Sequence, residues 1–259
     1  MFKKRIIIGG LPRAGTTLLR YILDSSPDVI SGPETGFFRR PLVAQKARLR
    51  RVVERVDRTL DLGVAELSRI IHGEQNSVKA FDEIMKKYSE KVGVKKDVWA
   101  EKTPRNCFSY HWLAEEDPEL YFISLIRDGR DVVTSVLDGG DTYHCSIDRY
   151  VETLDSVYEF DLTKYKHLII PYEDMVRCPE RVFRNIFNFL ELKFTQDILE
   201  NYQVVSTTRD SSKVRQSKVQ HAITPKWIGR WGRPEHAARI SEFMMDERAV
   251  NWLIATGYD

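Results

Sequence analysis

A glycine-rich segment near the start of the chain contains the residue types that bind a phosphate group. It reads Gly9-Gly10-Leu11-Pro12-Arg13-Ala14-Gly15-Thr16-Thr17 and stands between an apolar run and a segment with helical spacing. Glycines let the backbone curl so that its N–H groups converge on an anion, and the N-terminus of the following helix adds a positive dipole. The segment therefore predicts a phosphate-binding loop, with an ordinary strand-to-helix turn as the plainer alternative.

This loop lacks the lysine that nucleoside-triphosphate loops require. Gly10 and Gly15 have the G-x-x-x-x-G spacing, but Thr16 occupies the lysine position and the cation, Arg13, lies inside the loop. An enzyme that hydrolyses a magnesium nucleotide uses that lysine to reach the β- and γ-phosphates. The substitution argues against ordinary kinases and GTPases. A P-loop phosphotransferase acting on a small molecule is kept as the alternative function.

The Pro-Arg-x-Gly-Thr-Thr-Leu form of the loop resembles the 5′-phosphosulfate-binding loop of sulfotransferases that use 3′-phosphoadenosine 5′-phosphosulfate (PAPS). It is similar to the tyrosylprotein and carbohydrate branches. The resemblance implies transfer of a sulfuryl group from PAPS to a hydroxyl of a glycan, a small molecule or a tyrosine, which leaves adenosine 3′,5′-bisphosphate. The implied cofactor-binding residues of the loop are Pro12, Arg13, Ala14, Gly15, Thr16 and Thr17.

A second segment resembles the 3′-phosphate-binding segment of this family. An apolar run over 121–126 is followed by Arg127-Asp128-Gly129-Arg130-Asp131-Val132-Val133-Thr134-Ser135. Arg127 at the strand end and Ser135, expected two turns into a helix, can reach one phosphate, and a guanidinium paired with a hydroxyl suits a dianion. Taken alone, the two residues have a plainer interpretation as a helix cap and a surface serine.

Lys102 matches the catalytic lysine of the family. Its segment, Trp99-Ala100-Glu101-Lys102-Thr103-Pro104, resembles the E-K-[ST]-P segment of this branch. The implied role of Lys102, together with Arg13, is to neutralise the leaving 5′-phosphate and the oxygens of the moving group, because sulfuryl transfer depends mainly on positioning and charge. No metal is implied. A solvated lysine before a helix is the alternative.

The acceptor hydroxyl needs a base, because alcohols and phenols are hardly ionised at neutral pH. Cytosolic members of the family place a histidine two residues after the motif lysine, but Pro104 occupies that position here. Gly32-Pro33-Glu34-Thr35 instead resembles the G-E-E-T segment of tyrosylprotein sulfotransferases, which maps the base onto Glu34. Gly36 replaces an arginine that those enzymes use toward acidic peptides, although Arg40 falls on a second one.

Further cofactor contacts are implied later in the chain. Tyr172, in a Tyr-Glu pair, resembles the cofactor-contacting tyrosine that follows the last core strand. The segment over 206–224 is basic and poor in apolar residues, which predicts a mobile lid over the cofactor. The expected cofactor-binding residues of this lid are Ser212, Lys213 and Lys218. His144 and Cys145 are weaker candidates for the acceptor side.

The elements that must position these residues alternate between strand and helix. Buried strands are expected over 3–9, 29–31, 98–101, 121–126 and 167–171, where apolar runs end at turn residues. A helix is expected over 16–25, then one long basic helix over 42–60, and further helices up to about residue 93. Later helices are expected to begin after Thr103-Pro104, at 132 and at 179, and the last is expected over 234–254. This alternation predicts a single α/β domain over 1–259, with a parallel sheet covered on both faces and ligands at the carboxyl ends of its strands.

The composition is that of a globular chain. Its 259 residues are 42% hydrophobic, and 40 Lys+Arg stand against 38 Asp+Glu, a net charge of +2. These values and the lack of any apolar stretch near ~18 residues exclude the disordered, collagen and membrane-spanning classes. The three scattered cysteines, and histidines without metal spacing, indicate neither disulfides nor a metal site. A cytoplasmic location is expected, and the oligomeric state cannot be inferred.

One basic segment stands out from this balance. From Arg39 to Arg58 there are eight arginines and lysines against Glu54 and Asp57. The favoured interpretation is the wet face of an amphipathic helix, and the alternative is a surface for an anionic acceptor such as an acidic glycan. A non-catalytic nucleotide sensor or nucleic-acid module built around this helix is a second rival. The near-zero net charge does not favour nucleic acid as a partner.

Overall fold

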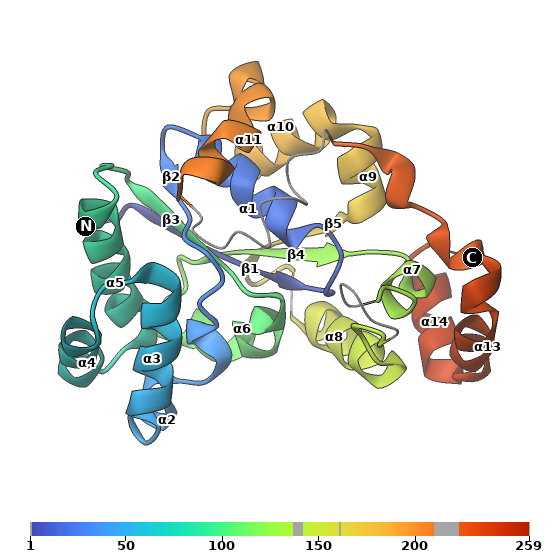
Figure 1. Cartoon of the computed structure of the whole chain (residues 1–259), viewed down its shortest axis with the longest axis horizontal. Coiled ribbons are helices and arrows are strands. Elements are labelled where there is room, and N and C mark those ends of the chain that lie inside the picture. Colours follow the sequence, from blue (N-terminus) through green and yellow to red (C-terminus); the bar gives the residue numbers. More distant parts are fainter. Residues whose placement is uncertain (1, 137–141, 161, 210–222, 259) are drawn as a thin grey trace.

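Five parallel strands form the central sheet, in the order β2-β3-β1-β4-β5 (Figure 1). The computed structural model describes residues 2–136, 142–160, 162–209 and 223–258. The strands are β1 Lys4–Gly10, β2 Val29–Ile30, β3 Val98–Lys102, β4 Tyr121–Ile126 and β5 Lys166–Pro171. Each neighbouring pair runs parallel. The predicted α/β class with a central parallel sheet is confirmed.

Helices cover both faces of this sheet. Above it in Figure 1 lie α1 Thr16–Ser25, α9 Tyr172–Arg177, α10 Pro179–Phe189 and α11 Gln196–Arg209. Below it lie α2 Leu42–Lys46, α3 Leu49–Leu60, α4 Val64–Gly73, α5 Ser77–Lys91, α6 Tyr110–Glu116 and α8 Ile147–Glu159. Helices α7 Gly129–Val133, α13 Ala237–Met245 and α14 Glu247–Ala255 gather near the C-terminus. The short 3-10 helices are η1 Phe37–Arg39, η2 Pro104–Ser109, η3 Pro225–Trp227, η4 Arg230–Gly232 and η5 Pro234–His236.

Alternate side chains of the strands enter two separate cores. Ile6 and Ile8 of β1 pack into a cluster that includes α1, α9 and α10, whereas Ile7 packs into a cluster that includes α3, α4, α5 and α6. All three isoleucines are fully buried, because a parallel sheet covered on both faces leaves its central strand no contact with water. Helix α8 contributes to both cores, with Leu154 in the first and Val157 in the second, whereas the other helices named here each pack into one.

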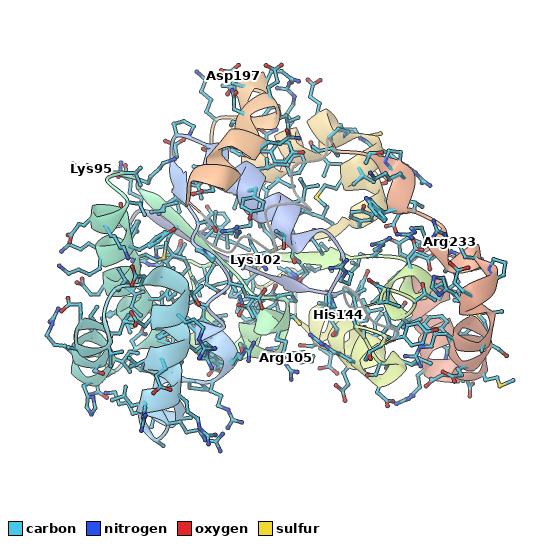
Figure 2. All side chains as sticks on the ribbon, viewed as in Figure 1. Lys95, Lys102, Arg105, His144, Asp197 and Arg233 are labelled. Atoms are coloured by element: carbon cyan, nitrogen blue, oxygen red, sulfur yellow. The ribbon has the colours of Figure 1, made fainter. Side chains whose placement is uncertain are left out.

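The register of the strands brings the predicted functional segments to one edge. Ile8 of β1 lies opposite Lys102 of β3, and Gly10 lies opposite Leu125 of β4. Because the strands are parallel, the residues that follow them emerge on the same side. In Figure 2, Lys95 before β3 lies at the margin of the molecule, and Lys102 at the end of β3 lies near its middle.

Two long helices expected from the sequence are broken in the structure. The basic helix over 42–60 divides into α2 and α3, because Arg48 between them has a non-helical backbone, and Val43 is 71% exposed rather than packed. The last helix over 234–254 divides at Asp246, whose extended backbone ends α13 and whose carboxylate caps α14 by accepting from two backbone N–H groups. Both expectations of a continuous helix were wrong.

Two further helices differ from the sequence prediction. The helix expected from 132 onward ends at Val133, and the chain then runs into an antiparallel bridge between Val136 and Tyr143. After Thr103 the first turns are a 3-10 helix, and the Thr103 side chain makes no cap hydrogen bond among the described residues. In the part of the chain that the structure describes, no helix is long and apolar enough to span a membrane.

Candidate functional site

The glycine-rich loop between β1 and α1 has the backbone of an anion-binding turn. Gly10, Arg13 and Gly15 all have positive φ, and Arg13 adopts φ 65°, which is uncommon for a residue with a side chain. A Cβ atom at Gly10 would lie 2.3 Å from the carbonyl oxygen of Leu125, so only glycine fits there. No described side chain caps the N-terminus of α1. The first N–H groups of this helix therefore remain for an anion.

A buried polar network supports the loop from below. A Cβ at Gly9 would lie 2.7 Å from the hydroxyl oxygen of Tyr110, so the aromatic ring lies directly against the backbone. Tyr110 donates to the carbonyl of Ile123 (3.1 Å) and accepts from Ser124 (3.1 Å), which lies 2.8 Å from Nε2 of His167. Burial lowers the pKa of His167 to about 4, so this histidine is neutral near pH 7.

The two predicted 3′-phosphate residues both contact Arg13. Arg127 donates from Nη1 to the Arg13 carbonyl (2.8 Å), and Arg13 donates from Nε to the hydroxyl of Ser135 (3.0 Å). Ser135 lies beyond the end of α7, so the expectation that it stands two turns into a helix was wrong. The guanidinium of Arg127 also lies 4.4 Å over the ring of Tyr172. The structure therefore brings together four residues predicted from three separate motifs.

Asp131, which the sequence analysis did not select, ties a distant segment to this cluster. Its carboxylate accepts from Arg127 (3.1 Å) and from the backbone N–H groups of Gly229 (2.9 Å) and Trp231 (3.0 Å). Arg127 donates in addition to the carbonyl of Trp227. Among the described residues, the buried Nε of Arg127 has no hydrogen-bond partner. That atom is an N–H donor that a bound phosphate could satisfy.

The predicted lid can be placed only at its two ends. Ser212, Lys213 and Lys218 lie outside the described residues. Helix α11 ends at Arg209, and the next described residue is 223. The contacts of Gly229 and Trp231 with Asp131 then place the segment after the gap beside Arg127.

Glu34 and Lys102 form an ion pair at the carboxyl end of β3. Nζ of Lys102 lies 2.7 Å from Oε2 of Glu34, and the side chains are 4% and 25% exposed. Burial lowers the pKa of Lys102, the nearby Glu34 carboxylate opposes this effect, and Arg20 adds to it. The predicted base and the predicted catalytic cation are thus neighbours, and Glu34 keeps access to the surface.

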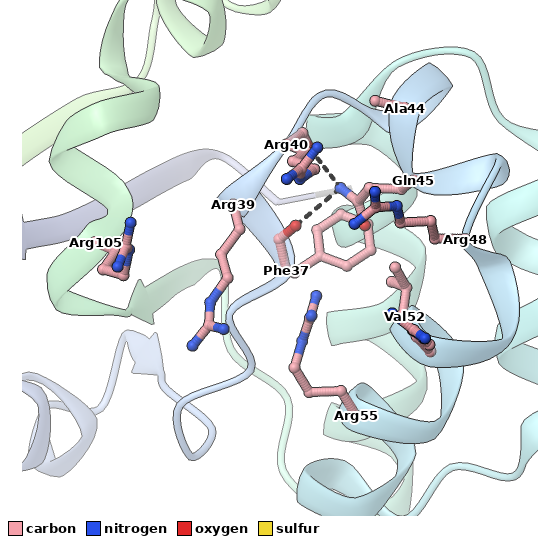
Figure 3. A pocket seen from close by; sticks show the side chains of 10 residues that line it. Phe37, Arg39, Arg40, Ala44, Gln45, Arg48, Val52, Arg55 and Arg105 are labelled. Atoms are coloured by element: carbon pink, nitrogen blue, oxygen red, sulfur yellow. Dashed lines mark hydrogen bonds between the residues drawn. The ribbon is translucent and has the colours of Figure 1, made fainter.

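A pocket lined by arginines adjoins the segment that carries Glu34. It has a volume of about 400 Å³. Its lining residues are Phe37, Arg39, Arg40, Ala44, Gln45, Arg48, Arg51, Val52, Arg55 and Arg105. Figure 3 shows Arg39 between Arg105 on one side and Arg55 on the other. None of these ten residues is acidic, so the pocket is strongly positive.

The favoured interpretation of the basic segment, a solvent-exposed helix face, holds for most of its cations, because Arg48, Arg50, Arg51 and Arg58 are exposed. A wet helix face describes Arg50, which is 91% exposed and paired with Glu54. Arg55 instead turns inward and donates to the carbonyls of Thr35 (3.0 Å) and Gly36 (2.9 Å). Sequence periodicity could not identify the pocket, because one wall comes from Arg105 after β3 and depends on the tertiary fold.

Two further predictions concern Cys145 and the absence of a metal ion. Cys145 is buried in the core, where desolvation raises the pKa of its thiol to about 11, so its placement on the acceptor side was wrong. Glu173, beside Tyr172, accepts from the hydroxyl of Tyr258 (2.5 Å) and from the N–H of Asp128 (3.2 Å). Among the described residues no group of three or more His, Cys, Asp or Glu side chains could hold a metal ion. The expectation of a metal-free reaction stays a prediction.

The geometry can be compared with known proteins. The model of the sulfotransferase family matches residues 5–196. Protein-tyrosine sulfotransferase 1 of Danio rerio is 30% identical over 244 residues, and the match covers 87% of this chain and 66% of that protein. The Homo sapiens protein-tyrosine sulfotransferase 1 is 28% identical over 259 residues, with 87% and 63% covered. The chain thus spans slightly less than two thirds of the length of these relatives.

Solved structures show the same fold. The sulfotransferase domain of the Synechococcus PCC 7002 olefin synthase superposes with a TM-score of 0.69 at 19% identity, covering 99% of this chain and 94% of that one. The sulfotransferase domain from the curacin biosynthetic pathway superposes with a TM-score of 0.61 at 16% identity, covering 100% and 99%. At these identities the likeness concerns the fold alone.

Proposed function

The chain belongs to the sulfotransferase family, and on this premise we propose that it transfers a sulfuryl group from PAPS to a hydroxyl group of an acceptor. The observation that carries the proposal is the Glu34–Lys102 ion pair, which stands beside the phosphate loop at the same edge of the sheet. A base and a buried cation next to an anion site are what this reaction requires.

The residues of the loop edge fit the donor. The uncapped N-terminus of α1 and the backbone of the loop suit the 5′-phosphosulfate, and Arg13 adds a positive charge. Arg127 and Ser135 suit the 3′-phosphate, because the Nε of Arg127 is a buried donor and the Ser135 hydroxyl lies within reach of Arg13. We assign Pro12, Ala14, Gly15, Thr16, Thr17 and Tyr172 to the same donor site.

Glu34 and Lys102 divide the chemistry between them. PAPS supplies the sulfuryl group when bound. Glu34 accepts the proton of the acceptor hydroxyl, which raises the nucleophilicity of its oxygen. Lys102 and Arg13 neutralise negative charge on the phosphate that is left and on the oxygens of the moving group. Burial of Lys102 strengthens this effect, because water screens its charge little.

The arginine pocket favours an acceptor that carries negative charge near its reactive hydroxyl. The pocket lies next to the segment that follows Glu34, since Arg55 lines it and also binds the carbonyls of Thr35 and Gly36. The relatives named above are protein-tyrosine sulfotransferases, which makes a tyrosine among acidic residues the first acceptor to test. Glycans with acidic groups share the same chemistry.

The rival functions are less well supported. Thr16 stands where a phosphotransferase of the P-loop type needs lysine, and the family match is to sulfotransferases. Location in the cytoplasm and a single domain over 1–259 stay predictions.

The direct test is transfer of label from sulfur-labelled PAPS. Three acceptors should be compared: a peptide with one tyrosine among aspartates, a sulfated oligosaccharide, and a neutral phenol. We expect label on an anionic acceptor, and the same rate in the presence of EDTA. Turnover of magnesium ATP with no transfer from PAPS to any of the three would contradict the proposal.

A further inference from the structure

Two consecutive residues of one loop meet two consecutive residues of β3. Glu34 pairs with Lys102, and the next residue, Thr35, pairs with the residue before it, Glu101. Oε1 of Glu101 accepts from the Thr35 hydroxyl (2.8 Å) and from the Thr35 backbone N–H (3.3 Å). The loop is therefore fixed to the strand at two adjacent points.

Glu101 is an unusual residue to find in the interior. It is 1% exposed, and its other contacts are with the Thr103 hydroxyl (2.8 Å) and with Nδ2 of Asn106 (2.5 Å). Among the described residues, none of its hydrogen-bond donors is a lysine or an arginine. Burial of a carboxylate costs free energy even when neutral donors satisfy it, so its presence calls for an explanation other than stability.

The partners of Glu101 connect three parts of the site. Thr35 follows the base Glu34, and the Thr103 hydroxyl, which donates to Glu101, also accepts from the Gly36 N–H (3.0 Å). Asn106 donates in addition to the carbonyl of Ile8 (3.1 Å), just before the phosphate loop. A single carboxylate thus joins the base loop to the strand that carries the phosphate loop.

The opposite side of the Thr35 peptide is held by Arg55. Its guanidinium donates to the carbonyls of Thr35 and Gly36. The N–H and hydroxyl of Thr35 are consequently bound to a carboxylate, while its carbonyl is bound to a guanidinium. The loop therefore has little freedom to rotate at this residue.

We propose that Glu101 is a positioning residue that acts through Thr35 to hold the carboxylate of Glu34 against Lys102. This inference rests on the proposed function only for the role of Glu34 as base. Without the contact, the Glu34 loop is free to move away, and the distance between base and cation is no longer fixed. A misplaced base lowers the rate of the chemical step more than the binding of the donor.

The charge of Lys102 reports this position independently of any acceptor. The charged groups that act on Lys102 are Glu34, Glu101 and Arg20. Glu34 raises the pKa of Lys102, so removing Glu34 from contact lowers it further. The titration of Lys102 is therefore a readout that a general loss of stability does not imitate.

The test compares three variants of buried threonines. Thr35→Val removes the hydroxyl donor and keeps the shape, and Thr35→Ser keeps the hydroxyl. Thr153→Val is the matched control, because Thr153 is equally buried and, among the described residues, its hydroxyl donates only within α8, to the carbonyl of Arg149 (2.6 Å). With the acidic tyrosine peptide as probe, we expect Thr35→Val to lower kcat by roughly 10-fold or more with the KM for PAPS within about 3-fold. Thr35→Ser should restore most of kcat, and Thr153→Val should have little effect.

Competitive acetylation of Lys102 over a range of pH, read by mass spectrometry, provides the second measurement. We expect a lower pKa for Lys102 in Thr35→Val than in the wild type and in Thr153→Val; Glu101→Gln does not serve for this measurement, because the charge of Glu101 itself raises the pKa of Lys102. The positioning role is refuted if Thr35→Val matches Thr153→Val in both kcat and Lys102 titration. Full activity of Glu34→Gln would instead refute the proposed base, and the acetylation result would still decide whether Glu101 holds the pair.

Discussion

The ammonium group of Lys102 lies 2.7 Å from the carboxylate of Glu34, although the two residues are 68 positions apart in sequence. An incoming hydroxyl must therefore approach a carboxylate that already has one strong partner. Proton transfer to Glu34 and charge stabilisation by Lys102 both depend on the same 2.7 Å contact. A change of pH that alters the charge of either residue should therefore affect both steps.

The first prediction follows from the lowered pKa of Lys102. The ammonium form of Lys102 supports catalysis, so kcat should fall as the pH rises through the pKa of Lys102. Because burial lowers that pKa, the fall should occur below pH 10.5, the ordinary pKa of lysine. Lys102→Arg keeps its charge over this range, so its residual activity should show no such decline. The measurement is kcat against pH from 6 to 10.5. Equal midpoints for the wild type and Lys102→Arg would assign the decline to another group.

The second prediction separates the base from donor binding. Glu34→Gln keeps size and hydrogen bonding but cannot accept a proton, so turnover should fall by roughly 10²- to 10⁴-fold. Affinity for adenosine 3′,5′-bisphosphate, measured by calorimetry, should stay within a few-fold. Glu66→Gln is the control, because Glu66 pairs only with Arg69 on the surface of α4 among the described residues. Near-normal turnover of Glu34→Gln, with loss of turnover in His144→Ala, would place the base near His144.

The third prediction concerns the 3′-phosphate. Adenosine 3′,5′-bisphosphate should bind at least ~10-fold more tightly than AMP, because a charged contact contributes about 1.5 to 3 kcal/mol. Arg127→Ala should abolish this preference. Arg248→Ala, at an exposed arginine paired with Asp246 and Asp148, should retain it. Equal affinity of the wild type for both nucleotides would remove the assignment of Arg127.

The fourth prediction tests the arginine pocket with two neighbouring residues. Arg51 lines the pocket, whereas Arg50 points to solvent and pairs with Glu54. Arg51→Ala should raise the KM for the acidic tyrosine peptide by roughly 5- to 10-fold with little change in kcat, and the difference should shrink in high salt. Arg50→Ala should stay within about 2-fold. If both variants raise the KM for the peptide equally, the acidic peptide is attracted by the positive charge of the whole surface and not by the pocket.

The fifth prediction concerns stability below neutral pH. The pKa of His167 is about 4 in the folded protein and 6.5 in an unfolded chain, so between these values only the unfolded chain binds the proton. The free energy of unfolding should therefore fall by about 2 kcal/mol from this residue between pH 7 and pH 5. His167→Gln should lose correspondingly less over the same interval in urea unfolding. Parallel losses in the two proteins would show that His167 does not contribute.

The sequence was sufficient to predict features that depend on local chemistry. The phosphate loop is one of these, because glycines at positions of positive φ and the helix after them are neighbours in sequence. Ser135 was misplaced for the opposite reason: the bridge between Val136 and Tyr143 ends α7, and that pairing is a tertiary contact. The arginine pocket depends in the same way on the break at Arg48.

Glu101 lies between these two cases. A glutamate at the end of an otherwise apolar strand is a visible signal, because a carboxylate is rarely buried without a purpose. Its partners Thr35 and Asn106, however, come from both sides of it in sequence. Only the fold identifies which segments the carboxylate joins.

The division of the interior into two cores has a consequence for how such a chain evolves. Helix α1 rests on one core, and α3, which supplies Arg51 and Arg55, rests on the other. The backbone of the sheet separates them, so repacking beneath α3 leaves the contacts beneath α1 intact. New acceptors can be acquired by mutation within one layer while use of the donor is inherited unchanged. Chimeras of related enzymes should accordingly exchange whole layers rather than halves of the sequence.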